Sequence, residues 1–204
     1  MTDHNLDTIL AISYLGNIHH YFYRMKHGNT IYDDTERYQK QTFRNRCQIL
    51  SANGVQSLTI PVVAKNKTII RDVKISYGID WQKQHWGALL SSYNHSPYFE
   101  YYRDYFEPFY TNHYEYLWDF NMELESVVLD LLDVSVVHLL KNQIDPVLAV
   151  EDKRLFITPK KPLDDPHFIS KPYRQMIFAK EGFVPNLSIV DLLFNQGTES
   201  YLYL

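Results

Sequence analysis

A short segment near the first quarter of the chain carries two arginines that are suited to holding an anion. It reads Arg44-Asn45-Arg46, with Lys40 just before it. A guanidinium group offers a planar fork of N–H donors that matches the oxygens of a carboxylate or phosphate. These residues therefore predict a site for an anionic small molecule such as a nucleotide sugar. The alternative is an internal ion-pair cluster with acidic residues of a neighbouring element: Asp33, Asp34 or Asp72.

His85 and Asp34 are the candidates for proton transfer. His85 and Trp86 are neighbours in a predicted helix, where successive side chains point about 100° apart, so only one can face the core fully. Trp86 is the better core residue, which leaves His85 as a general acid or base, since the ordinary pKa of histidine lies near neutrality. A hydrogen-bonded structural histidine is the alternative. Asp34 follows a predicted strand, at the end where open α/β sheets place ligands.

The other reactive residue types give weaker patterns. His19 and His20 are adjacent in a predicted helix and diverge, which argues against the paired-histidine motif of nucleotidyltransferases. No recognised metal-ligand spacing occurs among the nine histidines or at Asp33-Asp34, so no metal is predicted. Cys47 is the only cysteine, which excludes an internal disulfide. The sequence leaves any cofactor unknown.

Length and composition limit the class of protein. With 204 residues, 45% hydrophobic and 22% charged, the chain is expected to form one globular domain over residues 1–204. A net charge of −4 argues against general nucleic-acid binding. No apolar run reaches the roughly 18 residues of a membrane span, and Met1–Asp7 lacks a signal-peptide pattern, so a cytoplasmic protein is expected. The 17 tyrosines favour either half-buried packing positions or a hydrogen-bonding cavity.

The N-terminal elements that must position the candidate residues form two units. Thr8–Tyr14, Asn17–Lys26 and Thr30–Tyr32 read as strand, helix and strand. Asn53-Gly54, between two strand-like runs, favours a type I′ hairpin turn. That turn would pair Cys47 with Ile60 and would place Arg44 and Arg46 together on the face opposite Asn45 and the apolar residues. Ile69–Tyr77 is expected to add a strand.

The second half of the chain has mainly helical patterns. Helices are expected over Trp81–Tyr93, from Ser96-Pro97 onward, and over Tyr114–Leu132. In the second of these, an aromatic stripe of Tyr98, Tyr102, Tyr105 and Phe109 is expected to face the core. Asp145–Pro172 is rich in proline and reads as irregular, and Phe183–Gly197 contains a short helix with Ser188 and Asp191 at capping-box spacing. The predicted fold class is α/β: a mixed sheet, a strand–helix–strand unit, a hairpin and a helical layer.

Six sequence blocks resemble the WbqC-like family of bacterial proteins. They are YLGNIHHYF from Tyr14, YQKQTFRNRCQI from Tyr38, LTIPV from Leu58, HW at His85, SPYF from Ser96 and FVPNLSIVDLLFNQG from Phe183. The family commonly has a Gln-Pro pair before the first block, where this chain has Ile12-Ser13, and the region 135–166 is shorter here than in longer members.

The family is encountered among genes for surface polysaccharides, near enzymes that make amino sugars. The resemblance therefore implies a transferase or accessory protein in surface-glycan biosynthesis of the O-antigen type, with acyl or aminoacyl transfer to a nucleotide-linked amino sugar as its reaction. The competing hypothesis is a non-catalytic scaffold of a biosynthetic complex. Besides the segment from Lys40 to Arg46, candidate ligand-binding residues are Trp86 and the polar side chains of the last block, namely Asn186, Asp191 and Asn195. The oligomeric state cannot be read from the sequence.

Overall fold

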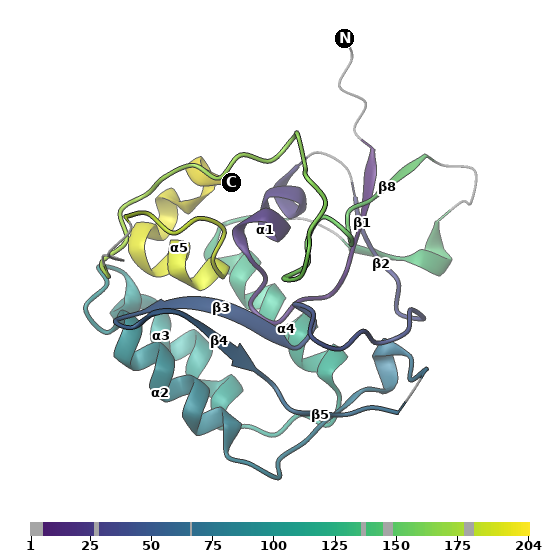
Figure 1. Cartoon of the computed structure of the whole chain (residues 1–204), viewed down its shortest axis with the longest axis horizontal. Coiled ribbons are helices and arrows are strands. Elements are labelled where there is room, and N and C mark those ends of the chain that lie inside the picture. Colours follow the sequence, from purple (N-terminus) through teal and green to yellow (C-terminus); the bar gives the residue numbers. More distant parts are fainter. Residues whose placement is uncertain (1–5, 27–28, 66, 136–137, 145–148, 178–181) are drawn as a thin grey trace.

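A parallel sheet forms the N-terminal part of the fold. The computed structural model describes residues 6–26, 29–65, 67–135, 138–144, 149–177 and 182–204 (Figure 1). Four strands lie in the order β7-β2-β1-β8, and each neighbouring pair is parallel. Their bounds are β1 Asp7–Leu10, β2 Thr30–Tyr32, β7 His138–Leu140 and β8 Val150–Asp152. Helix α1, Ile18–Met25, joins β1 to β2, so the predicted strand–helix–strand unit is confirmed with a shorter first strand.

The predicted hairpin is present, but its register differs from the expected one. In strands β3 (Arg46–Ser51) and β4 (Gly54–Thr59), Cys47 pairs with Leu58 rather than with Ile60. A type I′ turn needs positive φ at both central residues. Here Gly54 has a φ of 100°, and Asn53 is not among the residues with positive φ. The turn therefore consists of Ala52-Asn53, and the register moves by two residues, which keeps the side chains within β3 and β4 on their expected faces.

The remaining strands pair separately from both of these sheets. Strand β5, Val62–Val63, is antiparallel to β6, Lys74–Ile75, which lies within the third predicted strand-like run. Ile70–Asp72 in the same run forms a 3-10 turn, η1. The α/β class with parallel and antiparallel pairing is thus confirmed, and the two kinds of pairing lie in different sheets.

Helices cover the hairpin and supply most of the core. Helix α2 (Trp81–Tyr93) has the predicted bounds, and α3 (Phe99–Phe106) and α4 (Leu117–Leu131) begin a few residues later than predicted. The expected aromatic stripe is wrong in part. Tyr105 is 55% exposed, whereas Phe99 and Phe106, spaced seven residues apart, are fully buried. On α3 the phenylalanine rings therefore face the core, whereas the Tyr105 hydroxyl stays in contact with water.

The C-terminal helix is held by contacts from distant segments. Helix α5, Ile189–Gln196, ends at Gly197 as predicted, before a 3-10 stretch, Gly197–Tyr203 (η4). The expected capping box is absent: the Ser188 hydroxyl donates to the Leu15 carbonyl at 2.7 Å, and its backbone N–H donates to the Gln48 carbonyl at 2.8 Å. The starts of α1 and α5 therefore meet beside β3.

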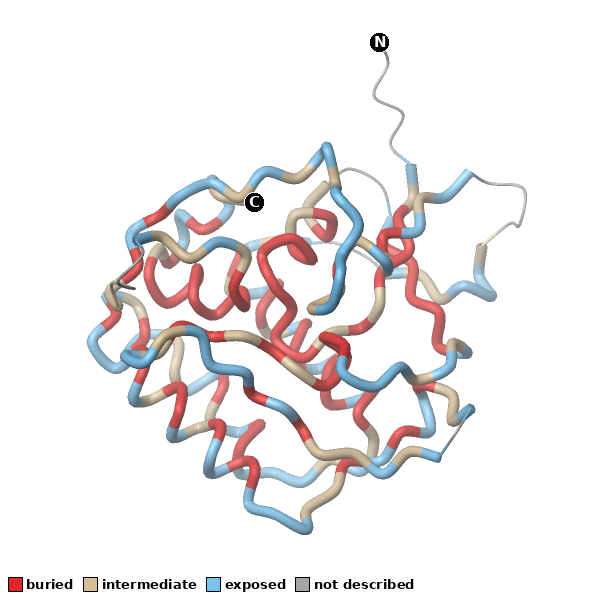
Figure 2. Tube along the Cα trace, viewed as in Figure 1, coloured by how far each residue is buried: buried red, intermediate tan, exposed pale blue. Residues whose placement is uncertain are grey.

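The segment between β8 and α5 is largely irregular, as its prolines predict, and it runs across α1 (Figure 1). Much of it is exposed, whereas the inner turns of α1 beneath it are buried (Figure 2). Two short 3-10 turns, Glu107–Tyr110 (η2) and Lys141–Gln143 (η3), complete the elements. None of the helices in the described ranges is both long and apolar enough to cross a membrane.

Candidate functional site

A cavity lies where the irregular segment crosses α1. It has a volume of about 430 Å³, and it is bounded by α1, β3, the loop before α5 and the stretch from Phe156 to Phe168. His19, Asp164, Asp165 and Asn186 are among the polar residues that line it. We call it the first cavity. Three segments far apart in the sequence meet here because the backbone contacts described above join the starts of α1 and α5 to β3.

A histidine and a carboxylate form a pair in the wall of the first cavity. His19 Nε2 lies 2.9 Å from Asp165 Oδ2, and the Tyr23 hydroxyl donates to the same oxygen at 2.7 Å. The His19 ring stacks on Phe168, with ring centroids 4.0 Å apart and planes 7° apart. Phe168 and Asp165 belong to the irregular segment, so the segment fixes the orientation of this ring.

The charges around the pair favour a neutral histidine and an ionised carboxylate at neutral pH. Burial lowers the pKa of His19, and the neighbouring carboxylate opposes that effect only in part. Burial acts to raise the pKa of Asp165, but the hydrogen bonds from Tyr23 and His19 outweigh it and hold that pKa below its ordinary value. Lys153 Nζ, 3.8 Å from the other Asp165 oxygen, adds a buried positive charge.

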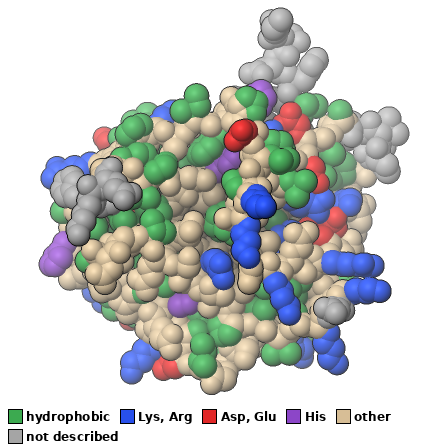
Figure 3. Space-filling view, viewed as in Figure 1, with side chains coloured by type: hydrophobic (Ala, Val, Ile, Leu, Met, Phe, Trp, Pro, Cys, Tyr) green, Lys and Arg blue, Asp and Glu red, His purple; other side chains and the backbone are tan. Residues whose placement is uncertain are grey.

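A second cavity, of about 210 Å³, adjoins the first. The two share Thr158 and Leu163 in their walls, and we call this pair of neighbouring cavities the cleft. No carboxylate lines the second cavity among the described residues, whereas four cationic side chains do: Arg44, Arg154, Lys160 and Lys161. Lys and Arg side chains gather in the middle of this face of the molecule (Figure 3). The cleft is therefore basic at one end and acidic at the other.

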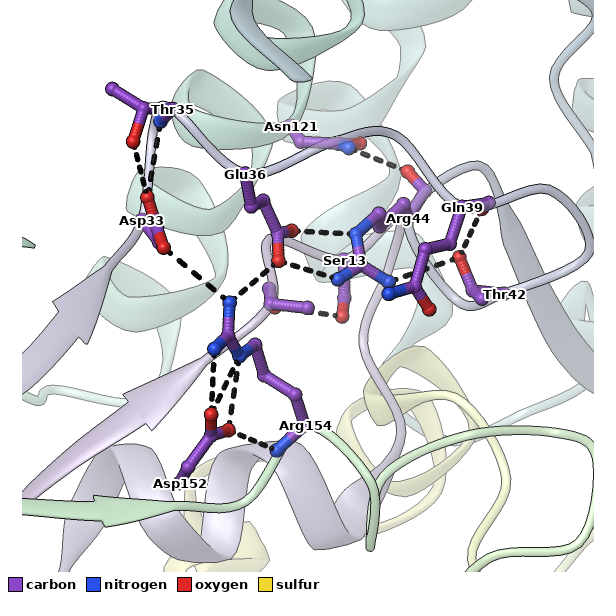
Figure 4. Close-up of polar contacts among 11 residues, drawn as sticks. Ser13, Asp33, Thr35, Glu36, Gln39, Thr42, Arg44, Asn121, Asp152 and Arg154 are labelled. Atoms are coloured by element: carbon purple, nitrogen blue, oxygen red, sulfur yellow. Dashed lines mark hydrogen bonds and ion pairs between the residues drawn. The ribbon is translucent and has the colours of Figure 1, made fainter. Parts of the chain in front are cut away.

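The two arginines of the second cavity are also part of an ion-pair cluster (Figure 4). Arg44 donates to both carboxylate oxygens of Glu36, at 2.6 and 2.8 Å, and Arg154 donates to Glu36 at 2.9 Å and to Asp152 at 2.6 Å. Arg44 is thus paired internally, as in the predicted alternative, but its partner is Glu36 rather than Asp33, Asp34 or Asp72. The lysines differ: Lys160 donates to the Gln41 amide, and no carboxylate lies within ion-pairing distance of Lys160 or Lys161 among the described residues.

Arg44 and Arg46 do not share a site, contrary to expectation. Arg46 lines a third hollow, of about 230 Å³, together with Lys40 and Asn45, and its Nε donates to Thr59 at 3.1 Å. The reason is that β3 begins only at Arg46, so the alternation of a strand does not extend back to Arg44. The Asn45 amide donates to the Ile60 carbonyl at 2.8 Å, which gives it a structural role at the edge of that hollow.

His85 and Trp86 take the reverse of their expected environments. His85 is 5% exposed, its Nδ1 lies 2.9 Å from the Tyr14 hydroxyl, and burial lowers its pKa to about 4. Trp86 is only partly buried and stacks on Tyr110. Neither lines any of the three hollows of the described structure. A catalytic His85 and a ligand-binding Trp86 stay predictions that this geometry does not favour.

The other predicted site residues divide between the cavity and the interior. Asn186 lines the first cavity, and its Oδ1 accepts the backbone N–H of His19 at 2.9 Å. Asp34 is paired with Arg71 at 3.1 Å, away from the cleft. Asp191 accepts hydrogen bonds from two tyrosine hydroxyls and one amide, and Asn195 accepts one from the Met176 backbone. The contacts of Asp191 and Asn195 are structural.

His19, Asp165 and Lys160 line the cleft but are not among the site residues predicted from the sequence. His19 was considered only together with His20, and the divergence expected of helix neighbours is present: His19 faces the cavity, while His20 contacts Glu125 at 3.0 Å in the core. Glu125, the partner of His20, is buried. Asp165 and Lys160 lie in the irregular segment, where no periodic pattern shows which way a side chain points.

Comparisons with known proteins assign the chain to a family. The model of the WbqC-like protein family matches residues 18–161 and 151–203. The chain is also similar to "Uncharacterized protein Rv1507c" of Mycobacterium tuberculosis (strain ATCC 25618 / H37Rv). The identity is 30% over an alignment 202 positions long, and the alignment covers 85% of this chain and 86% of the relative. No solved structure gives a significant match. From these matches, the chain belongs to the WbqC-like protein family.

Proposed function

We propose that this protein binds a nucleotide-linked amino sugar in the cleft and transfers an acyl or aminoacyl group to the sugar amine. The reaction would be a step in the assembly of a bacterial surface glycan of the O-antigen type. The observation that carries the proposal is the opposite charge of the two joined cavities. A nucleotide-linked amino sugar has complementary charges at its two ends: its diphosphate is anionic and its protonated amine is cationic.

The basic end suits the diphosphate. Lys160 and Lys161 are exposed and lack carboxylate partners among the described residues, so their charges are available to a ligand. Arg44 and Arg154 of the same cavity are paired with carboxylates, which fix their positions and offset much of their positive charge. Lysine ammonium groups bind phosphate oxygens through charge-assisted hydrogen bonds. The lysines are therefore the expected main anion ligands, and Arg44 is expected to shape the cavity floor.

The acidic end suits the sugar amine. Asp164 is exposed and Asp165 is ionised beside it, so two carboxylates line one wall of the first cavity. Asn186 and Gln48 add amide groups that can bind sugar hydroxyls. A volume of about 430 Å³ lies within the range that holds a small-molecule ligand, roughly 300–1,000 Å³.

Family membership supports the biological setting of the proposal. The family's association with surface-polysaccharide genes and amino-sugar enzymes agrees with a ligand that combines an amine with a diphosphate. Because nucleotide sugars are made in the cytoplasm, we expect the protein to act there. The relative from Mycobacterium tuberculosis is named an uncharacterised protein and adds no activity.

Calorimetric titration with UDP-glucosamine tests the proposal. The double substitution Lys160→Ala with Lys161→Ala is expected to weaken binding about tenfold or more, because each lost ammonium–phosphate contact contributes on the order of 1 kcal/mol. Lys83→Ala, at an exposed position of α2, is the matched control and should leave affinity unchanged. Absence of binding to the unmutated protein, or an equal loss in the control, would contradict the proposal.

A non-catalytic scaffold is the second candidate. The observation that favours it is that Arg44 is fully paired and His85 is enclosed in the aromatic core, so two of the predicted site residues are engaged by the protein itself. A scaffold would bind UDP-glucosamine without turnover when acyl donors are supplied. Incubation of the protein with UDP-glucosamine and acyl thioesters, followed by mass spectrometry of the sugar, separates the two candidates.

A further inference from the structure

We infer that His19 is the general base of the transfer reaction proposed above and that Asp165 is the positioning residue that orients it. The inference rests on the proposed function, because it needs an amine nucleophile in the first cavity. It is carried by geometry: His19 lines the acidic end of the cleft, its Nε2 is bonded to Asp165 at 2.9 Å, and Nδ1 has no hydrogen-bond partner among the described residues.

The hydrogen bond to Asp165 determines which nitrogen of His19 carries the proton. An ionised carboxylate can only accept hydrogen bonds, so the proton of the neutral imidazole sits on Nε2 and the lone pair remains on Nδ1. The ring cannot turn freely, because Phe168 stacks on one face and the Tyr23 hydroxyl occupies the same carboxylate oxygen. A carboxylate that holds an imidazole in one tautomer and stabilises its protonated form is the arrangement found in hydrolytic triads.

His20 provides a comparison within the same helix. It also contacts a carboxylate, with Nε2 3.0 Å from Glu125 Oε1, and both histidines are buried, but only His19 lines a cavity of the described structure. Tyr32 donates to the same Glu125 oxygen, and Arg24 is paired with it at 3.3 Å. The two histidine–carboxylate pairs thus lie on different sides of α1, one toward the core and one toward the cleft.

The reaction assigned to His19 is a proton transfer during acyl transfer. The sugar amine binds as an ammonium group and first gives one proton to solvent, and the neutral amine then attacks the acyl carbon of an ester or thioester donor. The new bond joins nitrogen to the acyl carbon, and the bond from that carbon to the oxygen or sulfur of the donor breaks. One proton leaves the nitrogen for Nδ1 of His19, and the imidazolium then gives it to the departing alkoxide or thiolate. Asp165 stabilises the positive charge in between.

Several charged groups set the pH at which His19 works. Asp165 favours the protonated ring, whereas Lys153 and His20 disfavour it, and burial is the largest influence and lowers the pKa. Glu151 lies 3.4 Å from Lys153 and reduces the effect of that ammonium group. The pH midpoint of the transfer rate should therefore lie below the ordinary pKa of histidine. Asp165→Asn removes the favourable charge and should move the midpoint to still lower pH.

Enzyme kinetics with UDP-glucosamine and acyl thioesters test the assignment. His19→Gln is expected to lower kcat about a hundredfold or more with little change in the affinity for UDP-glucosamine. Asp165→Asn should lower kcat less and shift the pH profile, which a merely structural loss would not do. An active wild type with an equally active His19→Gln overturns the inference alone, whereas a wild type without turnover overturns the proposed function and the inference with it.

A second measurement uses the unmutated protein and does not depend on folding of a variant. Diethyl pyrocarbonate acylates an unprotonated, accessible imidazole nitrogen, and peptide mass spectrometry locates the modification. His19 should be modified and protected by UDP-glucosamine, while His20 in the folded protein should stay unmodified. An unmodified His19, or modification that UDP-glucosamine leaves unchanged, contradicts the inference.

Discussion

Replacement of Glu125 by glutamine should destabilise the fold strongly at neutral pH. Glu125 lies on α4 and is the shared carboxylate of a buried cluster that holds the inner face of α1 through His20 and Arg24. Arg24 is fully buried, and its guanidinium nitrogens have no hydrogen-bond partner among the described residues, so the ion pair with Glu125 is their charge partner. Glu125→Gln therefore leaves a buried positive charge without its counter-ion, which costs about 3–5 kcal/mol in comparable sites.

The pKa of Glu125 gives a second estimate of the same quantity. Burial acts to raise this pKa, but Arg24 and the hydrogen bonds from His20 and Tyr32 outweigh it and lower the pKa from 4.5 to about 2. Because one pH unit corresponds to about 1.4 kcal/mol, the ionised form contributes roughly 3 kcal/mol of stability. The folded-state pKa lies below the unfolded value. The contribution is therefore complete above pH 4.5 and is lost as the pH falls toward 2.

Urea unfolding of the wild type and Glu125→Gln across that pH range measures the effect. The difference in unfolding free energy should be about 3 kcal/mol at neutral pH and should shrink as the wild-type carboxylate becomes protonated. Glu115→Gln is the control, because Glu115 is paired with Lys74 on the exposed surface, and it should leave the midpoint nearly unchanged. Equal stability of wild type and Glu125→Gln at neutral pH, or a difference independent of pH, would refute the reasoning.

Three further predictions concern the packing of the core: a pair of glycine substitutions, one aspartate substitution and one labelling experiment. Gly197→Ala should lower the free energy of unfolding in urea by several kcal/mol, because Gly197 has a φ of 59° and an added Cβ would lie 2.4 Å from the Tyr98 ring. Gly87→Ala, where an added Cβ meets open space on α2, should raise that free energy by about 0.5–1 kcal/mol. A Gly197→Ala variant more stable than Gly87→Ala would contradict the structure. Asp191→Asn should lower the unfolding free energy by about 1–3 kcal/mol, since an amide cannot accept all the hydrogen bonds of that carboxylate, while UDP-glucosamine binding stays unchanged. Cys47 should resist alkylation by iodoacetamide until the protein unfolds, because burial raises the pKa of its thiol; rapid labelling of the folded protein would contradict this.

Local pattern and turn chemistry predict much of the fold. The period of hydrophobic residues identifies α2 to the residue, and the alternation around Cys47 assigns the correct faces of the hairpin. The turn type was predicted wrongly because a glycine with positive φ also fits the residue after a two-residue turn, where Gly54 is found. Register within a face therefore could not be settled from Asn53-Gly54 alone.

The site is harder to predict because its chemistry is assembled by tertiary contacts. His19 and Asp165 are 146 positions apart, and nothing in either segment shows that they meet. Sequence adjacency made Arg44 and Arg46 look like one site, yet a carboxylate eight positions away, Glu36, holds Arg44. Ser188 was predicted to cap its own helix, but its hydroxyl donates a long-range hydrogen bond to the Leu15 carbonyl.

The most direct test of the dipolar cleft compares the affinities of UDP-glucosamine and UDP-glucose for the wild-type protein by titration calorimetry at mildly acidic pH. The two ligands share the diphosphate, and only the first carries an amine, which is protonated under these conditions. The carboxylates of the first cavity should make UDP-glucosamine the tighter ligand by about tenfold, the equivalent of about 1.4 kcal/mol. Equal affinities, or no binding of either ligand, would contradict the account.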